Sequence, residues 1–255
     1  MLLIVGGSYD AEARSAVAHL NRRPGPQRAA LLDAADLSRP GWRLLANDPH
    51  GGSLVAEGKV LPVSDLTGVL VRRLAVYPEE LQHVHADDRA YVASEMTALL
   101  AWWLRVLPVP VLNRPAGGIL CGPGRRPEQW RVAARDLGFP AVLLRREATR
   151  PPVLPAIHTE IVAVGEEIVG EALQTQADCV LALSREANVP LLYAGFDEFG
   201  ALVMAHSLPR LSVDLIEAVE RYVELNRESD QSLAEWSTSP TTRVASNCVP
   251  AGAQP

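Results

Sequence analysis

The chain has a single lysine and lacks the usual sequence motif of a phosphate-binding loop. Lys59 is the only lysine among its 24 lysine and arginine residues, so any reaction that needs an amine must use Lys59. No GxxxxGK[ST] loop occurs in the sequence. The glycine-rich stretch 117–124 does precede a predicted helix, as a phosphate-binding loop would. It contains Pro123 and lacks the GxGxxG order, which favours a connection over a binding loop.

A second group of residues has the types that bind zinc, because imidazoles and carboxylates are its common ligands. His83, His85, Asp87 and Asp88 resemble the HxHxDH motif of metallo-β-lactamase-fold hydrolases. Residues further along the chain at similar separations are His158, Asp178 and His206. Asp88 stands where that family has a histidine, and both aspartates also suit the N-terminus of a helix. A zinc hydrolase using His83, His85, Asp87 and His158 is therefore the alternative prediction.

The region 68–140, and more weakly 157–210, resembles ATP-grasp ligases of the graspetide or microviridin type, which cross-link ribosomal peptides. In that family an arginine-containing strand precedes a long helix with a glutamate. An Asn-x-Pro strand and a helix with a Q…A…GhP pattern follow. The matching segments are Val71-Arg72-Arg73, Tyr77-Pro78, Asp88-Arg89, Glu95, Val111-Leu112-Asn113-Arg114-Pro115, Gln129 and Leu137-Gly138-Phe139-Pro140.

This resemblance implies a nucleotide site, but the sequence lacks the ligands that the family uses there. Arg126 stands near the position of the first phosphate-binding lysine, and arginine does not replace lysine conservatively. The second lysine and its small adenine-binding subdomain have no counterpart, because the segment 140–157 is too short. Asp197 matches a magnesium aspartate of the family, whereas Met204 and His206 replace its glutamate and asparagine. These departures predict the loss of ATP-dependent catalysis.

Hydrophobic periodicity predicts alternating strands and helices. A first strand at 2–5 leads through a glycine turn into a helix at 11–20, and the strongest helix is predicted at 87–107. The second half of that helix is apolar nearly all round, which predicts burial in the core or contact with a second subunit. Further strands are predicted at 30–32, 42–45, 53–55, 59–63, 69–72, 109–113, 158–164, 167–169, 191–195 and 201–205, and further helices at 127–137, 178–187 and 212–225.

The predicted fold class is α/β. It comprises an N-terminal Rossmann-like (pre-ATP-grasp) domain at 1–117 and a remnant α/β ATP-grasp part at 118–228 without the small ATP-binding subdomain. Residues 229–255 are predicted to be a disordered tail. The net charge of −6 argues against a nucleic-acid surface, and no apolar run reaches the length of a membrane span. Three widely spaced cysteines without a signal peptide predict reduced thiols and a cytoplasmic protein.

The favoured hypothesis is a ligase scaffold that still binds a polypeptide but has lost the residues for ATP. It would be a non-catalytic, precursor-peptide-binding accessory protein in the biosynthesis of a ribosomally synthesised, post-translationally modified peptide (RiPP). It resembles the truncated ATP-grasp relatives of crocagin-like pathways. A divergent ATP-grasp peptide ligase using Arg126 is a second alternative.

This hypothesis predicts no catalytic residue, no cofactor and no metal. The expected partners are a precursor peptide, a separate modifying enzyme and a second copy in a homodimer, with no nucleic acid and no membrane. The peptide would add to a sheet edge or lie in an apolar groove, with arginines binding its acidic side chains. The residues predicted near that groove are Arg72, Arg73, Tyr77, Arg89 and Arg114.

Overall fold

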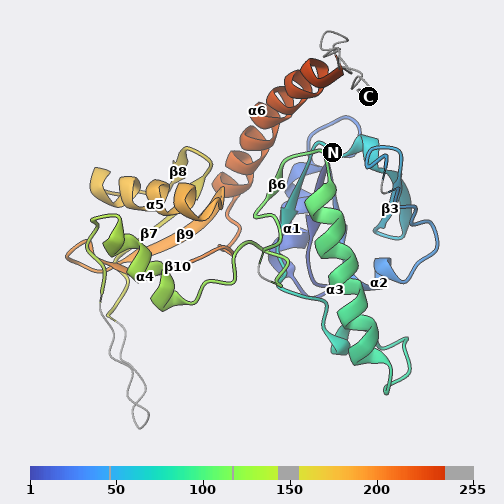
Figure 1. Ribbon diagram of the computed structural model, residues 1–255, viewed down its shortest axis with the longest axis horizontal. Coiled ribbons are helices and arrows are strands. Elements are labelled where there is room, and N and C mark those ends of the chain that lie inside the picture. Colours follow the sequence, from blue (N-terminus) through green and yellow to red (C-terminus); the bar gives the residue numbers. More distant parts are fainter. Residues whose placement is uncertain (46, 117, 143–154, 239–255) are drawn as a thin grey trace, which may run out of the picture.

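The computed structural model describes residues 1–45, 47–116, 118–142 and 155–238, with side chains described as far as Arg227. Two α/β halves lie side by side, and the long helix α6 (Val213–Thr238) runs between them (Figure 1). The first half contains a parallel sheet, and the second contains an antiparallel one. The predicted α/β class is therefore confirmed.

The first sheet has the strand order β2-β1-β5-β6. Each of its four strands is a short run of buried apolar residues, which is typical of parallel strands covered on both faces. β1 is an inner strand, since Leu2–Val5 pairs with β2 on one side and β5 on the other. The bounds are β1 (Leu2–Val5), β2 (Ala29–Leu32), β5 (Gly68–Val71) and β6 (Val111–Leu112).

Helices cover both faces of this sheet. α1 and α6 pack on one face around Ile4 and Leu70, and α3 packs on the other around Leu3 and Val71 together with the β3–β4 hairpin. The hairpin strands are antiparallel. The bounds are α1 (Ala11–Leu20), α2 (Ala34–Leu37), β3 (Ser53–Ala56), β4 (Lys59–Pro62), η1 (Val63–Asp65), η2 (Pro78–Glu80) and α3 (Arg89–Val106).

The second sheet has the order β10-β9-β7-β8 and is antiparallel throughout. α4 and α5 cover one face, where Trp130 and Phe196 are fully buried. Part of the opposite face, including Val164 and Leu191, packs against α6 and the first half. The bounds are α4 (Pro127–Asp136), β7 (Thr159–Val164), β8 (Glu167–Val169), α5 (Gln174–Ala187), β9 (Leu191–Phe196) and β10 (Leu202–His206).

α6 contacts both halves, and two glycines allow it to come close. A Cβ atom added at Gly68 would lie 2.7 Å from both γ-carbons of Val223, and one added at Gly165 would lie 2.7 Å from the ring of Tyr222. The predicted boundary at 117/118 separates the two sheets. α6, which belongs to the second predicted domain, nevertheless completes the core of the first half.

Most predicted elements are present, and two main differences stand out. The 42–45 segment is not a strand: Arg43 forms one bridge to Ser53, and Trp42 packs edge-on against Trp103 with ring centroids 5.6 Å apart. α6 continues to Thr238, so the first ten residues of the predicted tail are helical, and 239–255 lie outside the described residues. The polar, proline-containing segment 145–155, whose composition predicts a linker, lies outside the described residues except for Pro155. Among the described residues no helix is long and apolar enough to span a bilayer.

A buried asparagine fixes the two halves to each other. Asn113 is fully buried and has a left-handed backbone with φ 61°. Its Nδ2 donates to the carbonyl oxygens of Leu191, at 2.7 Å, and Ser207, at 3.0 Å, while its Oδ1 accepts from the Leu191 N–H at 3.0 Å. Beside it, Ser207 Oγ donates to the Cys121 carbonyl at 2.9 Å. This polar cluster connects β6 and the loop after it with β9 and the residue after β10.

Burial should protect two thiols of the folded chain from alkylation. Burial raises the pKa of the Cys121 thiol to about 11 and that of Cys179 to about 12. In a Cys248→Ser variant, mass spectrometry should find both thiols unmodified by iodoacetamide at about pH 8.5, and both modified in urea. Because the unfolded chain loses these protons near pH 9 and the folded chain does not, stability should fall as the pH rises through about 9 to 11. Rapid alkylation of folded Cys121 would contradict this.

Candidate functional site

The first sheet has a topological switch point between β1 and β5. The chain passes from β1 to β2 on one side of the sheet and reaches β5 on the other, so the loops after β1 and β5 diverge. A groove of about 520 Å³ opens at the carboxyl ends of these strands. We call it the switch-point groove, and it lies between residues 7–10, residues 72–80 and Leu208.

Large apolar side chains line the switch-point groove and are open to solvent. Tyr9 is 88% exposed, Tyr77 48% and Leu74 39%. Tyr9 follows the Gly6-Gly7 turn after β1, whereas Leu74 and Tyr77 follow β5. Leu208, from the segment between β10 and α6, forms the remaining apolar wall. Clustered exposed aromatic groups of this kind mark contact surfaces for other molecules.

The two arginines of the groove are bound by the protein itself. Arg72 donates from Nε to Asp10 at 2.9 Å, from Nη2 to Glu12 at 2.9 Å and from Nη1 to the Pro209 carbonyl at 2.6 Å. Arg73 is 5% exposed. It donates to the carbonyl oxygens of Ala75 and Gly6 and to the Glu80 carboxylate. Every guanidinium nitrogen of both residues therefore has an acceptor within the chain.

Of the five predicted site residues, the structure brings Arg72, Arg73 and Tyr77 together and places the other two elsewhere. Arg89 donates to the Val84 carbonyl at 2.9 Å, in the loop before α3. Arg114 donates to the carbonyl oxygen of Leu104 at 2.7 Å, at the C-terminal end of α3. Sequence reasoning missed Tyr9, Leu74, Glu79 and Leu208. For Tyr9 a signal existed, since it directly follows the glycine turn after the first strand.

The β1–α1 turn is not arranged as an anion site. The N-terminus of α1 is capped by Asp10, whose Oδ1 accepts from the Ala13 N–H at 2.9 Å, and Glu12 lies in the first turn. These carboxylates occupy the place where a phosphate would meet the free N–H groups and dipole of the helix. A nucleotide is therefore a poor ligand for the switch-point groove.

In the second half, the aspartate and histidine at the positions expected to bind magnesium have structural partners. Asp197 Oδ1 accepts from the N–H groups of Phe199, at 3.0 Å, and Ala201, at 2.8 Å, and so closes the β9–β10 turn. His206 stacks on Tyr193 with centroids 4.5 Å apart, and burial lowers the pKa of His206. Arg126 is an exposed residue at the start of α4, and Lys59 lies exposed on β4 in the other half.

The histidines of the zinc alternative do not converge. His83 Nε2 lies 2.7 Å from Ser38 Oγ, and the exposed His85 contacts Asp87 at 3.7 Å, both in the first half. His158 precedes β7 in the second half. Within the described part of the chain, no three histidine, cysteine, aspartate or glutamate residues lie where they could hold a metal ion together. The zinc-site alternative is therefore wrong: a matching spacing in sequence does not bring these side chains together in the fold.

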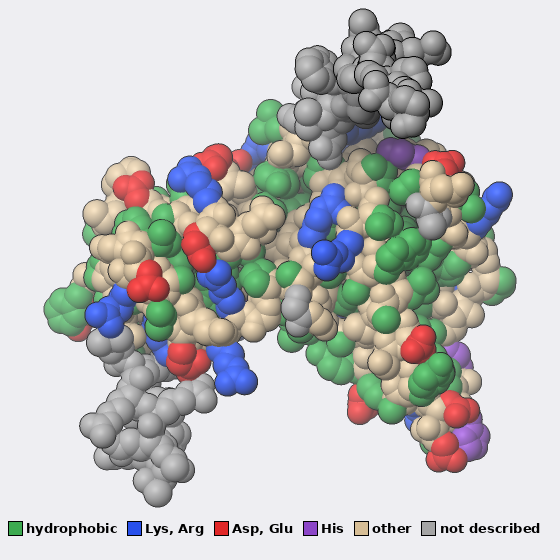
Figure 2. Space-filling model, in the orientation of Figure 1, with side chains coloured by type: hydrophobic (Ala, Val, Ile, Leu, Met, Phe, Trp, Pro, Cys, Tyr) green, Lys and Arg blue, Asp and Glu red, His purple; other side chains and the backbone are tan. Residues whose placement is uncertain are grey.

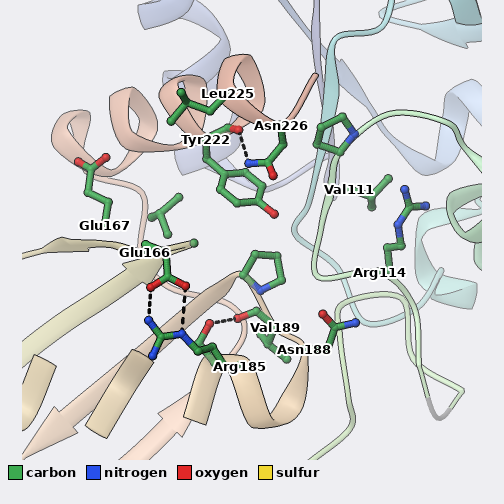
Figure 3. Close-up of a pocket in the computed structure, with 15 residues that line it drawn as sticks. Val111, Arg114, Glu166, Glu167, Arg185, Asn188, Val189, Tyr222, Leu225 and Asn226 are labelled. Carbon is green, nitrogen blue, oxygen red and sulfur yellow. Dashed lines mark hydrogen bonds and ion pairs between the residues drawn. The ribbon is translucent and has the colours of Figure 1, made fainter. Parts of the chain in front are cut away.

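A second cavity, of about 810 Å³, lies between the two halves. Tyr222 reaches into it from α6, opposite Val111 of β6, as Figure 3 shows. Arg114 also lines this cavity. Its charged rim is neutralised locally, because Arg185 Nε binds Glu166 at 3.0 Å and this ion pair lowers the pKa of Glu166.

Comparison with known proteins defines the fold. No family model and no curated protein matches the sequence. Among solved structures, macrocyclase MdnC from Microcystis aeruginosa MRC, bound to precursor peptide MdnA, matches with a TM-score of 0.63 and 13% identity, over 89% of this chain and 100% of that one. ATP-grasp ligase PsnB, complexed with a precursor variant, Mg and ADP, matches with 0.63 and 12%, over 89% and 98%.

A third match is a Chryseobacterium gregarium RiPP-associated ATP-grasp ligase in complex with ADP and a leader and core peptide. Its TM-score is 0.51 at 10% identity, over 92% of this chain and 96% of that one. The chain therefore has the fold of the ATP-grasp ligases that act in RiPP biosynthesis, which confirms the predicted resemblance.

Proposed function

We propose that this protein is a non-catalytic accessory protein that binds a ribosomal precursor peptide in RiPP biosynthesis. The observation that carries the proposal is the switch-point groove, an exposed apolar site on a fold whose solved relatives are bound to precursor peptides. The peptide would be presented to a separate modifying enzyme in the cytoplasm, where such precursors are made.

Among the described residues, binding of the peptide in a groove is better supported than its addition as a strand to a sheet edge. The edge strand β6 has only two residues, with Pro110 directly before it and Pro115 shortly after it, and β8 has three residues. On the outer edge of β2, Glu57 donates its backbone N–H to the Leu31 carbonyl at 3.2 Å. These edges offer few free backbone groups to an incoming strand. Side-chain anchoring in the switch-point groove is the route we favour.

The proposal of a non-catalytic role rests on the lack, among the described residues, of charged groups placed to hold the phosphates of ATP. Lys59 is the only lysine of the sequence and lies on the β3–β4 hairpin. In the second half, Asp197 is hydrogen-bonded within a turn and His206 is stacked on an aromatic ring. Phosphoryl transfer depends on charged groups held around the phosphates. A competing role as a ligase with Arg126 would require ATP to bind. ATP and Mg²⁺ at 100 times their dissociation constant would then stabilise the chain by about 2.7 kcal/mol.

Removing an aromatic anchor should weaken capture of the precursor. The peptide encoded beside the gene, labelled with fluorescein, should bind the wild-type chain, and Tyr77→Ala should weaken binding about tenfold or more, as loss of a central aromatic contact does. The control is Tyr91→Ala, because Tyr91 is also exposed but lies on α3. Fluorescence anisotropy measures both. Unchanged affinity in Tyr77→Ala would show that the peptide does not bind in the switch-point groove. ATP consumption by the pure protein with the peptide would overturn the non-catalytic role.

We also propose that the outer face of α3 joins two copies. Leu99, Trp102 and Val106 are 40%, 39% and 36% exposed at helical spacing, and hydrophobic side chains gather over this face in Figure 2. Trp103, by contrast, is 3% exposed and belongs to the core. Trp102→Glu should therefore convert a dimer to a monomer of 27.5 kDa in light scattering with an unchanged circular dichroism spectrum. A wild-type monomer at micromolar concentration would refute this.

A further inference from the structure

We infer that the peptide segment taken by the switch-point groove carries an aromatic or aliphatic anchor beside a basic residue, and that acidic segments are disfavoured. This rests on the proposed function and names the chemistry of its ligand. It also revises the expectation that arginines would hold acidic side chains.

The charge around the groove is the first support. Asp10, Glu79 and Glu80 line the groove, and Glu12 binds one of its arginines from the rim. Four carboxylates thus stand against two guanidinium groups. The whole chain is also acidic, with a net charge of −6.

The second support is that both guanidinium groups of the groove already have partners in the chain, whereas one carboxylate has none among the described residues. Each guanidinium nitrogen of Arg72 and Arg73 already donates to an acceptor of the chain, so an acidic ligand would have to compete with existing ion pairs. Glu80 is likewise occupied, by Arg73 and by the Tyr77 N–H. Glu79 is exposed, and its carboxylate makes no hydrogen bond or ion pair with any described residue. A lysine or arginine of the ligand would therefore meet Glu79 without disturbing the site.

The apolar wall determines the neighbouring ligand residue. Large apolar surfaces are exposed to water on Tyr9, Leu74 and Tyr77, and Leu208 lines the same groove. An aromatic or branched aliphatic side chain would bury these surfaces. Since Glu79 and Tyr77 are two residues apart, at the start of η2, the basic residue and the anchor should be near neighbours in the peptide.

A displayed library of random 12-residue peptides tests this without assuming a partner. Selection on the wild-type chain, followed by counter-selection on Tyr77→Ala, isolates clones that depend on the groove. Those clones should be enriched in lysine or arginine within three positions of an aromatic or aliphatic residue, and depleted in glutamate and aspartate. For a synthetic clone, Glu79→Lys should weaken binding about three- to tenfold at low salt, with the difference shrinking at high salt. Glu198→Lys, at an exposed residue of the β9–β10 turn, should leave binding unchanged.

The outcomes separate the inference from the proposed function. Groove-dependent clones that are acidic or carry no charge preference would overturn the inference while leaving peptide binding intact. Equal effects of Glu79→Lys and Glu198→Lys would also overturn it. If no clone depends on Tyr77, the groove does not bind peptides and the inference fails, and capture of the precursor by anisotropy then decides the proposed function separately.

Discussion

Replacing Asn113 with aspartate should lower the free energy of unfolding by about 2–4 kcal/mol. The side chain is fully buried, and its Nδ2 donates to the carbonyl oxygens of Leu191 and Ser207 from the second half. Aspartate has the same shape but, when ionised, can only accept. It would place a carboxylate against two carbonyl oxygens at distances near 3 Å, in a fully buried site.

Urea unfolding followed by tryptophan fluorescence measures this loss, and two further variants divide its causes. Asn113→Gly keeps the left-handed backbone at no steric cost and removes only the side-chain bonds, whereas Asn113→Ala adds about 1 kcal/mol of backbone strain. Asn188 provides the matched control, because it has φ 52° at the exposed C-terminus of α5. Asn188→Asp should cost less than about 0.5 kcal/mol. Similar losses for aspartate at both positions would mean that Asn113 does not hold the halves together.

The elements of this fold were predictable where the local pattern was strong. The buried run at Leu2–Val5, the helix at Ala11–Leu20 and the proline-initiated α4 all follow from short-range signals. Packing between distant segments decided the rest. The 42–45 segment has a strand-like composition, but Trp42 turns to the ring of Trp103 and donates to the Asp36 carbonyl at 2.9 Å. No periodicity within 42–45 carries that information.

The site was only half predictable for a related reason. Arg72 and Arg73 follow a buried strand, so a position at the end of the sheet could be expected, and in the structure both line the switch-point groove with Tyr77. Their partners could not be read from the sequence, because Asp10 and Glu12 lie on α1 and Pro209 lies beyond β10. The arginines predicted to bind acidic side chains of the peptide are therefore already paired within the chain. The exposed apolar set around Tyr9 became evident only when the loops were brought together.

The position of α6 connects the core to the switch-point groove. The segment leading into α6 supplies Leu208 to the groove, the Pro209 carbonyl to Arg72 and the Leu211 N–H, which donates to Glu12 at 3.1 Å. Any change that displaces α6 along the first sheet should therefore also distort one wall of the groove. The close approach of Val223 to β5 at Gly68 is the contact that fixes this position.

Gly68→Ala should cost about 1–3 kcal/mol, because the new methyl would lie 2.7 Å from both γ-carbons of Val223, well inside van der Waals contact. Val223→Ala alone should cost about 2 kcal/mol through lost burial. The double variant removes the clash, so its loss should be smaller than the two single losses together by about 1–2 kcal/mol, measured by urea unfolding. Gly124→Ala is the matched control, since the nearest neighbour of its added Cβ is at 3.7 Å. Strict additivity would show that α6 does not rest on Gly68. A rescued double variant that also regains peptide affinity lost in Gly68→Ala would show that the groove depends on where this helix sits.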